Sequence, residues 1–442
     1  MKAPMLGWYG DDFTGATDTL AVVAQAGLRS MLFMGVPDEA TLAAAGTLDA
    51  VGIAGAARAM APEAMRVELT SVAKFFHRIA PPVLHYKICS TFDSAPDVGN
   101  IACAINTLRL AVESPWVPIV GGQPSLNRYC VFSHLFASAG TGGEVHRIDR
   151  HPTMSQHPVT PMDEADLRIH LANQGLKNIT AVHYPDYDLS ESELNAKLLA
   201  LQMQYGAHHT LCPTLLDLTS PNQLPIIGRL IWQQAQVTRL LAVGSSGVAQ
   251  ALVAHWSESQ DWVAPVHAAL EPITAPVLAW AGSLSALTCA QVSAATSYLR
   301  IPVDAQRLCQ DPAYVHTVFS EICSGLESGQ HVLAYTAPAD RSMANVANAS
   351  HVALASAALI AQVVRARAEQ NKPLRRLGIA GGDTSSQAVK ALQLWGLSFQ
   401  STLCKGVTMS KAHSTDPALN GMEIMLKGGQ MGGENLFQQL LG

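Results

Sequence analysis

The sequence predicts an α/β protein of two domains, each with a mainly parallel sheet flanked by helices. The chain has 442 residues, beyond the size at which a single hydrophobic core stops growing. Hydrophobic residues make up 48% and charged residues 14%, as in proteins whose parallel strands are buried on both faces. Short apolar runs also alternate with helical stretches, which is the pattern of right-handed βαβ units.

This alternation covers most of the first 255 residues. Residues 115–122 and 130–136 are less regular, and residues 146–162, rich in Pro, His and Thr, predict a long loop. The expected strands are residues 5–9, 30–36, 48–54, 82–88, 178–183, 209–217 and 240–243, and the expected helices are residues 14–26, the stretch ending at 79, 166–173, 190–205, 223–235 and 248–255.

A polar, proline-containing break at residues 256–275 predicts the domain boundary, which gives domains of residues 1–265 and 266–442. The second domain should begin with a strand at 277–281 and a helix at 288–299. The apolar tract 352–364 is too short to span a bilayer and predicts a buried helix. Residues 424–426 predict an edge strand, because Glu423 precedes them.

Charge and cysteine usage exclude several classes of protein. The net charge is −6 and no basic block exists, which argues against nucleic acid or an anionic membrane as a partner. The eight cysteines are scattered singly, as in reduced proteins. Asp11 and Asp12 also interrupt the N-terminal segment before the apolar core of a signal peptide could form. We therefore expect a cytoplasmic protein.

Two adjacent acids follow the first predicted strand. Asp11 and Asp12 end the strand, and Thr14 opens the helix behind them. Open α/β sheets bind ligands at the carboxyl ends of their strands. We therefore expect the two carboxylates to accept hydrogen bonds from hydroxyls of a sugar-like substrate. The alternative is an acidic loop in which Asp12 or Thr14 caps the helix.

A lysine and two hydroxyls follow the fourth predicted strand. Lys87, Ser90 and Thr91 suit the carboxylate of a substrate. Arg58, just after the third strand, would face the same edge of the sheet. The alternative for both cations is an ordinary side chain with its charged end in water.

Residues 378–386 read Gly-Ile-Ala-Gly-Gly-Asp-Thr-Ser-Ser, an apolar strand that ends in glycines and leads into a helix. Free N–H groups at a helix N-terminus bind anions, so Gly381, Gly382 and Thr384 predict a phosphate site. Asp383 lies beside it, which suits phosphoryl transfer with Asp383 as general base or Mg²⁺ ligand. The alternative is a glycine turn in which Asp or Thr caps the helix.

Two further segments of the second domain could approach a nucleotide. Ser283 and Ser285 lie in a turn of small residues after the strand 277–281. Lys427, Gly428 and Gly429 begin a glycine-rich loop whose N–H groups could cover phosphates, with the lysine as a point charge. The alternatives are a polar strand-to-helix turn and a flexible linker.

Several catalytic motifs are missing from the sequence. It has no GxxxxGK[ST] motif of P-loop enzymes and no GxSxG elbow. It also lacks a GxGxxG motif after the first strand, which disfavours a nicotinamide dehydrogenase. The histidines show no spacing typical of a zinc site.

Taken together, the motifs DDFTGA, KxxST, GSxS, GGDT and KGGxxGG resemble the four-carbon acid sugar kinase family over nearly the whole chain. The resemblance implies ATP-dependent phosphorylation of a hydroxyl on a small sugar acid, with Mg²⁺. It implies an N-terminal substrate domain, a C-terminal nucleotide domain and an active site in the cleft between them. It places Asp11, Asp12, Thr14, Lys87, Ser90 and Thr91 at the substrate and Ser283, residues 381–384, Gly428 and Gly429 at ATP. Either Asp383 or Asp12 could be the general base.

One departure from the family pattern concerns the substrate. The family usually reads KxDSTLRGN in the central motif, whereas this chain has Cys89 in place of the acid and no arginine after Thr91. Arg128 or Arg150 could replace that arginine. The variant resembles a branch acting on an oxidised acid, 3-oxo-isoapionate. Threonate, erythronate or 3-oxo-tetronate kinase activity is the alternative.

A different class of protein shares the two-domain layout, namely a binding protein that encloses a sugar acid without chemistry. Two glycine-rich anion loops in the second domain are more than such a protein needs. The expected partners are therefore a small sugar acid and ATP, and homo-oligomerisation stays open.

Overall fold

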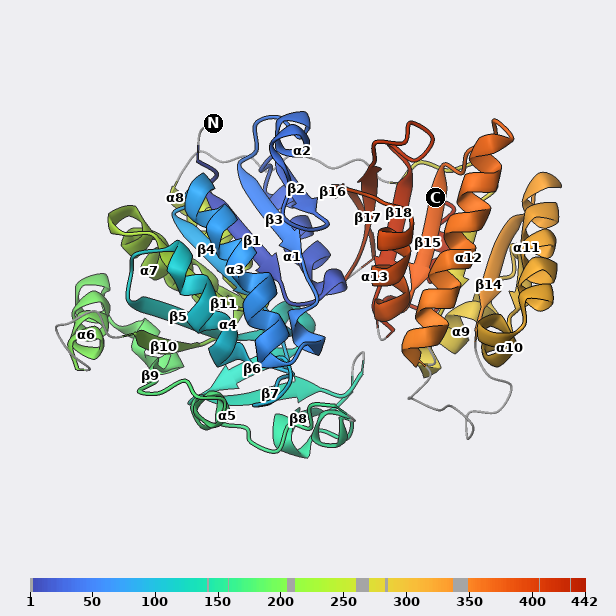
Figure 1. Ribbon diagram of the computed structural model, residues 1–442. Coiled ribbons are helices and arrows are strands. Elements are labelled where there is room, and N and C mark those ends of the chain that lie inside the picture. The colour runs from blue at the N-terminus through green and yellow to red at the C-terminus, as the bar shows by residue number, and fades with distance from the viewer. Residues whose placement is uncertain are drawn as a thin grey trace. The chain divides into compact units, whose positions relative to one another are not determined.

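The computed structural model describes residues 3–140, 143–157, 159–204, 211–259, 270–282, 285–336, 349–404, 406–429 and 431–442. The chain forms two compact units (Figure 1). Unit 1 comprises Met1–Met31 and Gly35–Pro265, and unit 2 comprises Leu32–Met34 and Val266–Gly442.

A parallel sheet forms the core of unit 1, with the strand order β3-β1-β4-β11-β5-β10-β9. All residues of β1, β3, β4, β5, β10 and β11 are buried, which explains their continuous apolar sequences. The strands are β1 (Leu6–Gly10), β3 (Ala50–Ala54), β4 (Val83–Lys87), β5 (Trp116–Gln123), β9 (Thr180–Val182), β10 (Cys212–Asp217) and β11 (Leu240–Gly244). Strand β2 (Ser30–Phe33) is not part of this sheet, because its residues Leu32 and Phe33 belong to unit 2 and pair there with Leu397 and Gly396.

Helices cover both faces of this sheet (Figure 1). Helices α1 (Phe13–Gln25), α7 (Leu224–Val237) and α8 (Gly247–Ser259) pack together on one face. Helices α3 (Pro62–Ile79) and α4 (Ile101–Leu108) pack together on the other. The chain after β1 and the chain after its neighbour β4 therefore leave the sheet toward opposite faces. Such a switch point is where open α/β sheets bind ligands.

The last residues of β5 leave the parallel sheet and begin an antiparallel one with β6 (Arg128–Val131), β7 (His134–Ser138) and β8 (Val145–Arg147). The sequence pattern here was too irregular to predict these strands, because each has only three to five residues. The remaining helices of unit 1 are α2 (Glu39–Ala44), α5 (Leu167–Asn173) and α6 (Glu191–Met203).

Unit 2 has a sheet with the order β13-β14-β12-β15-β18-β17-β16. The first five strands are parallel and the last two are antiparallel, so the predicted α/β class with mainly parallel sheets is confirmed. The strands are β12 (Leu278–Ala281), β13 (Tyr298–Pro302), β14 (His331–Tyr335), β15 (Arg376–Ala380), β16 (Gly396–Cys404), β17 (Val407–His413) and β18 (Glu423–Lys427).

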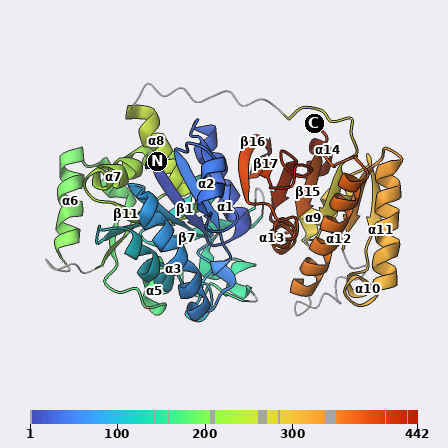
Figure 2. The same ribbon diagram turned by 45° about the horizontal axis from the view of Figure 1, so that its top comes forward.

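The helices of unit 2 also lie on both faces of its sheet (Figure 2). Helices α9 (Ala286–Ala294) and α14 (Leu436–Gln439) share a hydrophobic core with one face. Helices α10 (Ala305–Gln310), α11 (Pro312–Glu327), α12 (Ala349–Glu369) and α13 (Gly382–Ala391) lie on the other face. The chain after β12 and the chain after its neighbour β15 therefore diverge, as they do after β1 and β4 in unit 1.

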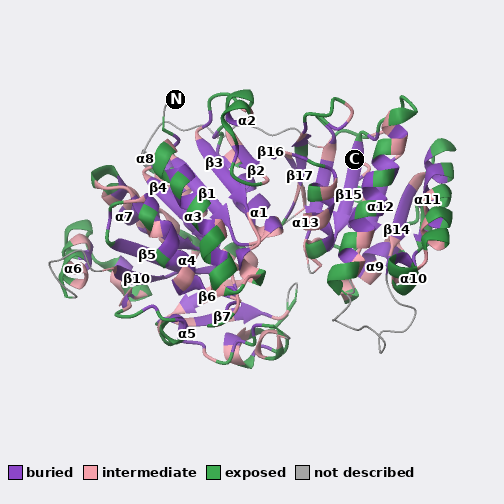
Figure 3. Ribbon diagram, in the orientation of Figure 1, coloured by how far each residue is buried: buried purple, intermediate pink, exposed green. Residues whose placement is uncertain are grey.

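Helix α12 contains the apolar tract that predicted a buried helix. Of the described helices, it alone is long and apolar enough to cross a membrane, and 44% of its apolar window is buried inside the protein. It packs against α11 and α13. In Figure 3 the strands are purple, that is buried, and the helices are green, that is exposed, on their outer sides. Helix α12 has buried residues along its length in the same way, as expected for a helix that covers a sheet.

Two predictions for unit 2 were wrong. Strand β18 is not an edge strand, because the β16–β17 hairpin pairs with its outer side. Glu423 is accommodated there by an ion pair with Arg376 at 2.6 Å. The helix predicted at 288–299 ends at Ala294, since Tyr298 already begins β13.

Candidate functional site

The carboxyl edge of the sheet in unit 1 brings together the side chains that the sequence singled out. Asp11 and Asp12 follow β1, Arg58 lies in a short helical turn after β3, and Lys87 is the last residue of β4. Both β3 and β4 pair directly with β1 in parallel register. The predicted cluster therefore forms at the switch point of this sheet.

Arg58 holds both aspartates. Its Nε and Nη2 atoms donate to the two carboxylate oxygens of Asp11, at 3.1 and 2.7 Å. Nη2 also donates to Asp12 Oδ1 at 2.8 Å. Asp12 is the N-cap of α1, accepting from Gly15 N at 3.0 Å, and Thr14 Oγ1 donates to its other oxygen at 2.8 Å. The alternative role of Asp12 as a helix cap is thus realised within the same cluster.

The environment pushes the pKa values of the two acids apart. Burial raises the pKa of Asp11, and Arg58 offsets this effect only in part. Burial acts in the same direction on Asp12, but Arg58, Lys87 and the hydrogen bonds from Thr14 and Gly15 outweigh it and lower the pKa of Asp12. Asp12 is therefore firmly ionised at neutral pH, and its side chain is 26% exposed, against 4% for Asp11. Of the two carboxylates, Asp12 is the one accessible to a ligand.

Lys87 brings a second positive charge to the cluster, near Asp12, whose pKa it helps to lower. The residue is only 4% exposed, and no hydrogen bond or ion pair joins its ammonium group to another described residue. Its Nζ lies so close to α1 that a Cβ atom at Gly15 would come within 2.2 Å of it. A buried ammonium group without a hydrogen-bonding partner is unfavourable, which points to an anionic ligand.

The central motif after β4 forms a local network. Thr91 is buried, and its hydroxyl donates to Asp93 and contacts Cys89 Sγ at 3.0 Å. Ser90 is half-buried. Burial raises the pKa of the Cys89 thiol, and Asp93 raises it further, so Cys89 is a neutral thiol. The acid of the family pattern is thus replaced by an uncharged group next to Asp93.

Sequence reasoning missed a second polar group at this edge. Asp18, one turn of α1 beyond Thr14, accepts hydrogen bonds from Ser246 at the start of α8 and from Gln123 of β5, the latter at 3.4 Å. The i, i+4 spacing from Thr14 to Asp18 could have pointed to it, because it places both residues on one face of the helix.

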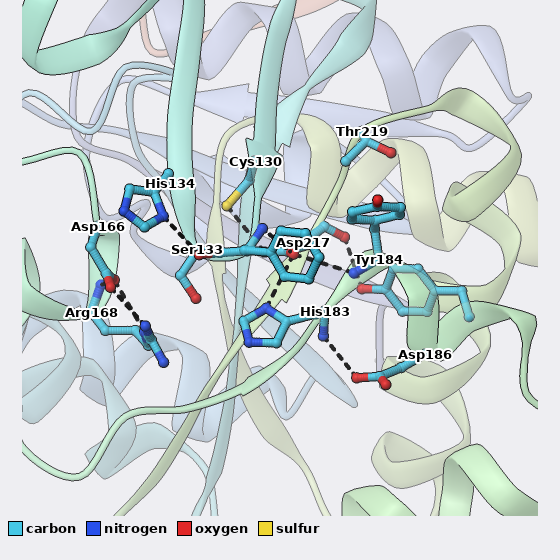
Figure 4. Close-up of polar contacts among 12 residues, drawn as sticks. Cys130, Ser133, His134, Asp166, Arg168, His183, Tyr184, Asp186, Asp217 and Thr219 are labelled. Atoms are coloured by element: carbon cyan, nitrogen blue, oxygen red, sulfur yellow. Dashed lines mark hydrogen bonds and ion pairs between the residues drawn. The ribbon is translucent and has the colours of Figure 1, made fainter.

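Figure 4 shows a contrasting carboxylate whose role is structural. Asp217, at the end of β10, is fully buried and accepts from the backbone N–H groups of Phe132, Ser133 and Tyr184 at 2.8, 3.0 and 3.2 Å. The ring of His183 adds a contact at 3.2 Å. With its acceptors occupied, Asp217 holds the β6–β7 turn in place.

In unit 2, the N-terminus of α13 is left open. Gly381 is the N-cap, has φ +128°, and provides no side chain to cap the helix. Its own N–H donates to Lys427 O at 2.9 Å, but those of Gly382, Asp383 and Thr384 have no acceptor among the described residues. A Cβ atom built at Gly382 would meet nothing within 4 Å. The predicted anion site therefore has free donors and open space beside it.

Gly282, at the end of β12, lies against this site. Its N–H donates to Ala380 O at 2.7 Å, and a Cβ atom on it would come within 2.2 Å of Thr384 Oγ1. Thr384 is thus fixed by a backbone that only glycine can bring so close. Ser283, the next predicted contact, lies outside the described residues.

Lys427 organises the glycine loop that follows it. Its buried ammonium group donates to Gln291 Oε1 at 2.6 Å, Thr288 Oγ1 at 3.1 Å, Met431 O at 3.2 Å and Gly429 O at 3.5 Å. Burial lowers the pKa of Lys427 to about 8. The expected contact of this lysine with a phosphate stays a prediction, while its contacts with α9 and the loop show a positioning role.

Ser285 ties the same loop to α9. Its hydroxyl caps the helix at Thr288 N, 3.1 Å away, and donates to Gly429 O at 2.5 Å. Thr288 Oγ1 reaches the same carbonyl at 3.0 Å. Gly429 and its neighbour Gly428 are therefore held beside the N-terminus of α9.

Asp383 is exposed in the first turn of α13 and bonds to no other described residue. Within the described ranges, no group of three or more His, Cys, Asp or Glu side chains could hold a metal ion. A single carboxylate beside a phosphate site nevertheless suits Mg²⁺, which is bound through one or two carboxylates together with substrate phosphates and water.

Comparison with known proteins agrees with this layout. Residues 6–252 match the family model described as a sugar-binding N-terminal domain, and residues 278–437 match a nucleotide-binding C-terminal domain. The chain is 34% identical to the 3-oxo-isoapionate kinase of Paraburkholderia graminis, over 98% of this chain and 93% of that protein. The chain belongs to this family of sugar-acid kinases. The predicted family and the predicted class of enzyme, a phosphotransferase, are thereby confirmed.

Other relatives include the 3-oxo-tetronate kinases of Methylobacterium radiotolerans, 28% identical over 99% of this chain and 98% of that protein, and Brucella melitensis, 26% identical over 98% and 94%. Among solved structures, a Salmonella typhimurium LT2 protein superposes with a TM-score of 0.79 at 23% identity. Haemophilus influenzae protein HI1011 superposes with a TM-score of 0.73 at 22% identity. Each structure covers 98% of both chains and shares the fold.

Proposed function

We propose that this protein is an ATP-dependent kinase that phosphorylates a hydroxyl group of an oxidised sugar acid, with 3-oxo-isoapionate as the first candidate. The observation that carries the proposal is the likeness to 3-oxo-isoapionate kinase at 34% identity, compared with 28% for the 3-oxo-tetronate kinase of Methylobacterium radiotolerans. A 3-oxo-tetronate is the second candidate, and threonate and erythronate follow.

The substrate acid would bind at the carboxyl edge of the sheet in unit 1. The ammonium group of Lys87, which donates no hydrogen bond to a described residue, would pair with an anionic group of the acid. Asp12, Ser90 and Thr91 would bind its hydroxyl groups. Arg58 is committed to Asp11 and Asp12, so we assign it the positioning of these carboxylates rather than a direct contact with the acid.

ATP would bind in unit 2, with a phosphate group on the free N–H groups of Gly382, Asp383 and Thr384. The loop at Gly428 and Gly429, held by Lys427 and Ser285, would add backbone contacts. Asp383 would hold Mg²⁺, which supplies charge neutralisation to the phosphates when bound.

In the transfer step, the oxygen of the substrate hydroxyl forms a bond to the γ-phosphorus, and the bond from phosphorus to the β,γ-bridging oxygen breaks, releasing ADP. The hydroxyl proton passes to a carboxylate. Asp12 suits this role because it is ionised and accessible, whereas Asp11 is buried behind Arg58. Asp383 is the second candidate for the base. We also propose a cytoplasmic location, since ATP is the phosphoryl donor.

The test is ADP release with MgATP across a panel of acids: 3-oxo-isoapionate, the 3-oxo-tetronates, and D- and L-threonate and erythronate. We expect the largest kcat/KM with a 3-oxo acid. A larger kcat/KM for threonate or erythronate would overturn the proposed substrate, whereas the proposed kinase activity would stand. Acid binding without ADP release from any member would favour the non-catalytic binding protein.

A further inference from the structure

Arg128, on β6, lies beside the carboxyl end of β5, at the edge of the sheet where the substrate acid is proposed to bind. In the β5–β6 ladder it lies directly opposite Gln123. Directly opposed residues of an antiparallel pair project from the same face. The side chain of Gln123 donates to Asp18 on α1, one turn beyond Thr14. Arg128 therefore lies on the side of the hairpin that faces this helix.

The guanidinium group of Arg128 is held in place but has no acidic partner. Nη1 donates to Leu126 O at 2.6 Å and to Asn127 O at 3.3 Å. Nε is buried and has no hydrogen-bond partner, and none of the described carboxylates forms an ion pair with the residue. Burial lowers the pKa of Arg128, and the carboxylate of Asp93 acts in the opposite direction, so the central motif is near this arginine.

Two other arginines of unit 1 pair with carboxylates of the protein. Arg58 pairs with Asp11 and Asp12, and Arg168 pairs with Asp166 at 2.7 Å. Arg150, the other candidate from the sequence, is 76% exposed at its side chain, and its one acidic neighbour among the described residues is Asp149, at 3.9 Å. A half-buried guanidinium group whose direction is fixed and whose charge is unpaired is energetically unfavourable unless an anion binds to it.

We infer that Arg128 is a specificity-determining residue that binds the carboxylate of the substrate acid through Nη2 of its guanidinium group, which donates no hydrogen bond to a described residue. Nη2 presents two N–H donors in the plane of the guanidinium group, a fixed geometry that an ammonium group cannot reproduce. Lys87 then supplies a second positive charge at the same edge of the sheet. The inference rests on the proposed function, since it assumes an acidic substrate.

The experiment compares Arg128→Gln, Arg128→Lys and the control Arg150→Gln by calorimetric binding without ATP and by turnover. The probes are 3-oxo-isoapionate, 3-oxo-tetronate and the carboxamides of both. Arg128→Gln should weaken binding of the acids about 10- to 100-fold, as expected for a lost charge-assisted pair. Arg128→Lys should weaken acid binding less, and Arg150→Gln should leave it unchanged. The carboxamides, which bind weakly to the wild type, should bind about equally to every variant. The KM for MgATP and the melting temperature should stay as in the wild type.

The outcomes separate the inference from the proposed function. If Arg128→Gln binds the acids as well as the wild type, or loses acid and carboxamide equally, the inference is wrong whatever the turnover. If the wild type binds an acid without releasing ADP and Arg128→Gln loses that binding, the proposed function fails and the inference stands. If the wild type binds none of the acids, both are overturned.

Discussion

Arg58 and Asp11 form a two-point ion pair in which each carboxylate oxygen accepts one N–H, at 3.1 and 2.7 Å. The pair lies behind the accessible Asp12, which the same guanidinium group also contacts. It keeps a buried negative charge compensated and fixes the direction of the acid that faces the ligand.

Arg58→Gln should therefore destabilise the fold as well as the site. It leaves Asp11 buried without its cation, a change that costs about 3 kcal/mol or more. Urea unfolding should show this loss, and turnover should fall because Asp12 loses its orientation. The matched control is Arg29→Gln, which removes a similar pair with Asp49 at the surface and should change stability little. Equal effects of the two substitutions would contradict the role of Arg58.

Two glycine substitutions should separate fold from nucleotide binding in unit 2. Gly382→Ala has open space for its methyl group, so we expect a normal melting temperature but a KM for MgATP raised about tenfold, because the methyl group enters the phosphate site. Gly282→Ala should displace Thr384 and affect both quantities. Gly35→Ala, which also meets nothing within 4 Å, should leave both unchanged. An unaltered KM in Gly382→Ala would remove α13 from the ATP site.

Ser133→Gly should stabilise the protein. Ser133 has φ +69° and a buried hydroxyl without a hydrogen-bond partner. The left-handed backbone and the unpaired hydroxyl each cost about 1 kcal/mol or more, and glycine removes both against an entropy loss of about 0.5–1 kcal/mol. We expect a gain of about 1 kcal/mol in the free energy of unfolding. A loss would show that the hydroxyl has a favourable role.

His85 should make the protein sensitive to acid. It is fully buried on β4 and contacts Gly244 O at 3.1 Å, and burial lowers its pKa to about 3. Between pH 6.5 and about 3 the unfolded chain binds the proton and the folded chain does not, so stability falls as the pH falls, by at most about 1.4 kcal/mol per pH unit. His85→Gln should flatten this part of the pH–stability curve. An unchanged slope would refute the assignment.

Lys427 should affect stability at the other end of the pH scale. Its pKa is about 8 in the folded protein, against 10.5 for an ordinary lysine, so the unfolded chain binds more protons between these values. The stability of the wild type relative to Lys427→Met should therefore rise with pH across this window. Lys427→Met should also raise the KM for MgATP, because the loop loses its contacts with α9. A KM unchanged by the substitution would argue against the positioning role.

The sequence predicted the elements that lie on strong local patterns. The buried strands β1, β3 and β4 are continuous apolar runs bounded by polar residues, and the acids and the lysine that follow them must then meet at one edge. Because this argument needs only strand direction, the sequence alone was enough to bring Asp11, Arg58 and Lys87 together. The free N–H groups of α13 followed in the same way from the glycines ahead of the helix.

What the sequence could not predict depends on distant contacts. Strand β18 looked like an edge strand because the β16–β17 hairpin that covers it, at residues 396–413, was not itself predicted from the sequence. Arg128 emerged only as one of two candidates, since its distinction from Arg150 lies in burial and in the lack of an acidic partner. The contacts of Lys427 with α9 were not foreseen either, because the pattern does not reveal Gln291, whose side chain accepts a hydrogen bond from this lysine.

The β6–β7 turn has a practical consequence. Both of its central residues, Phe132 and Ser133, have positive φ, a geometry that two-residue hairpins usually obtain from Asn-Gly. Here Asp217, 85 residues further along the chain from Phe132, accepts their N–H groups and enforces the bend. The bend at the exposed residue 132 thus depends on Asp217 and does not need an Asn-Gly pair. A spectroscopic label attached at this position would lie on the same hairpin as Arg128 without replacing any residue of the proposed substrate site.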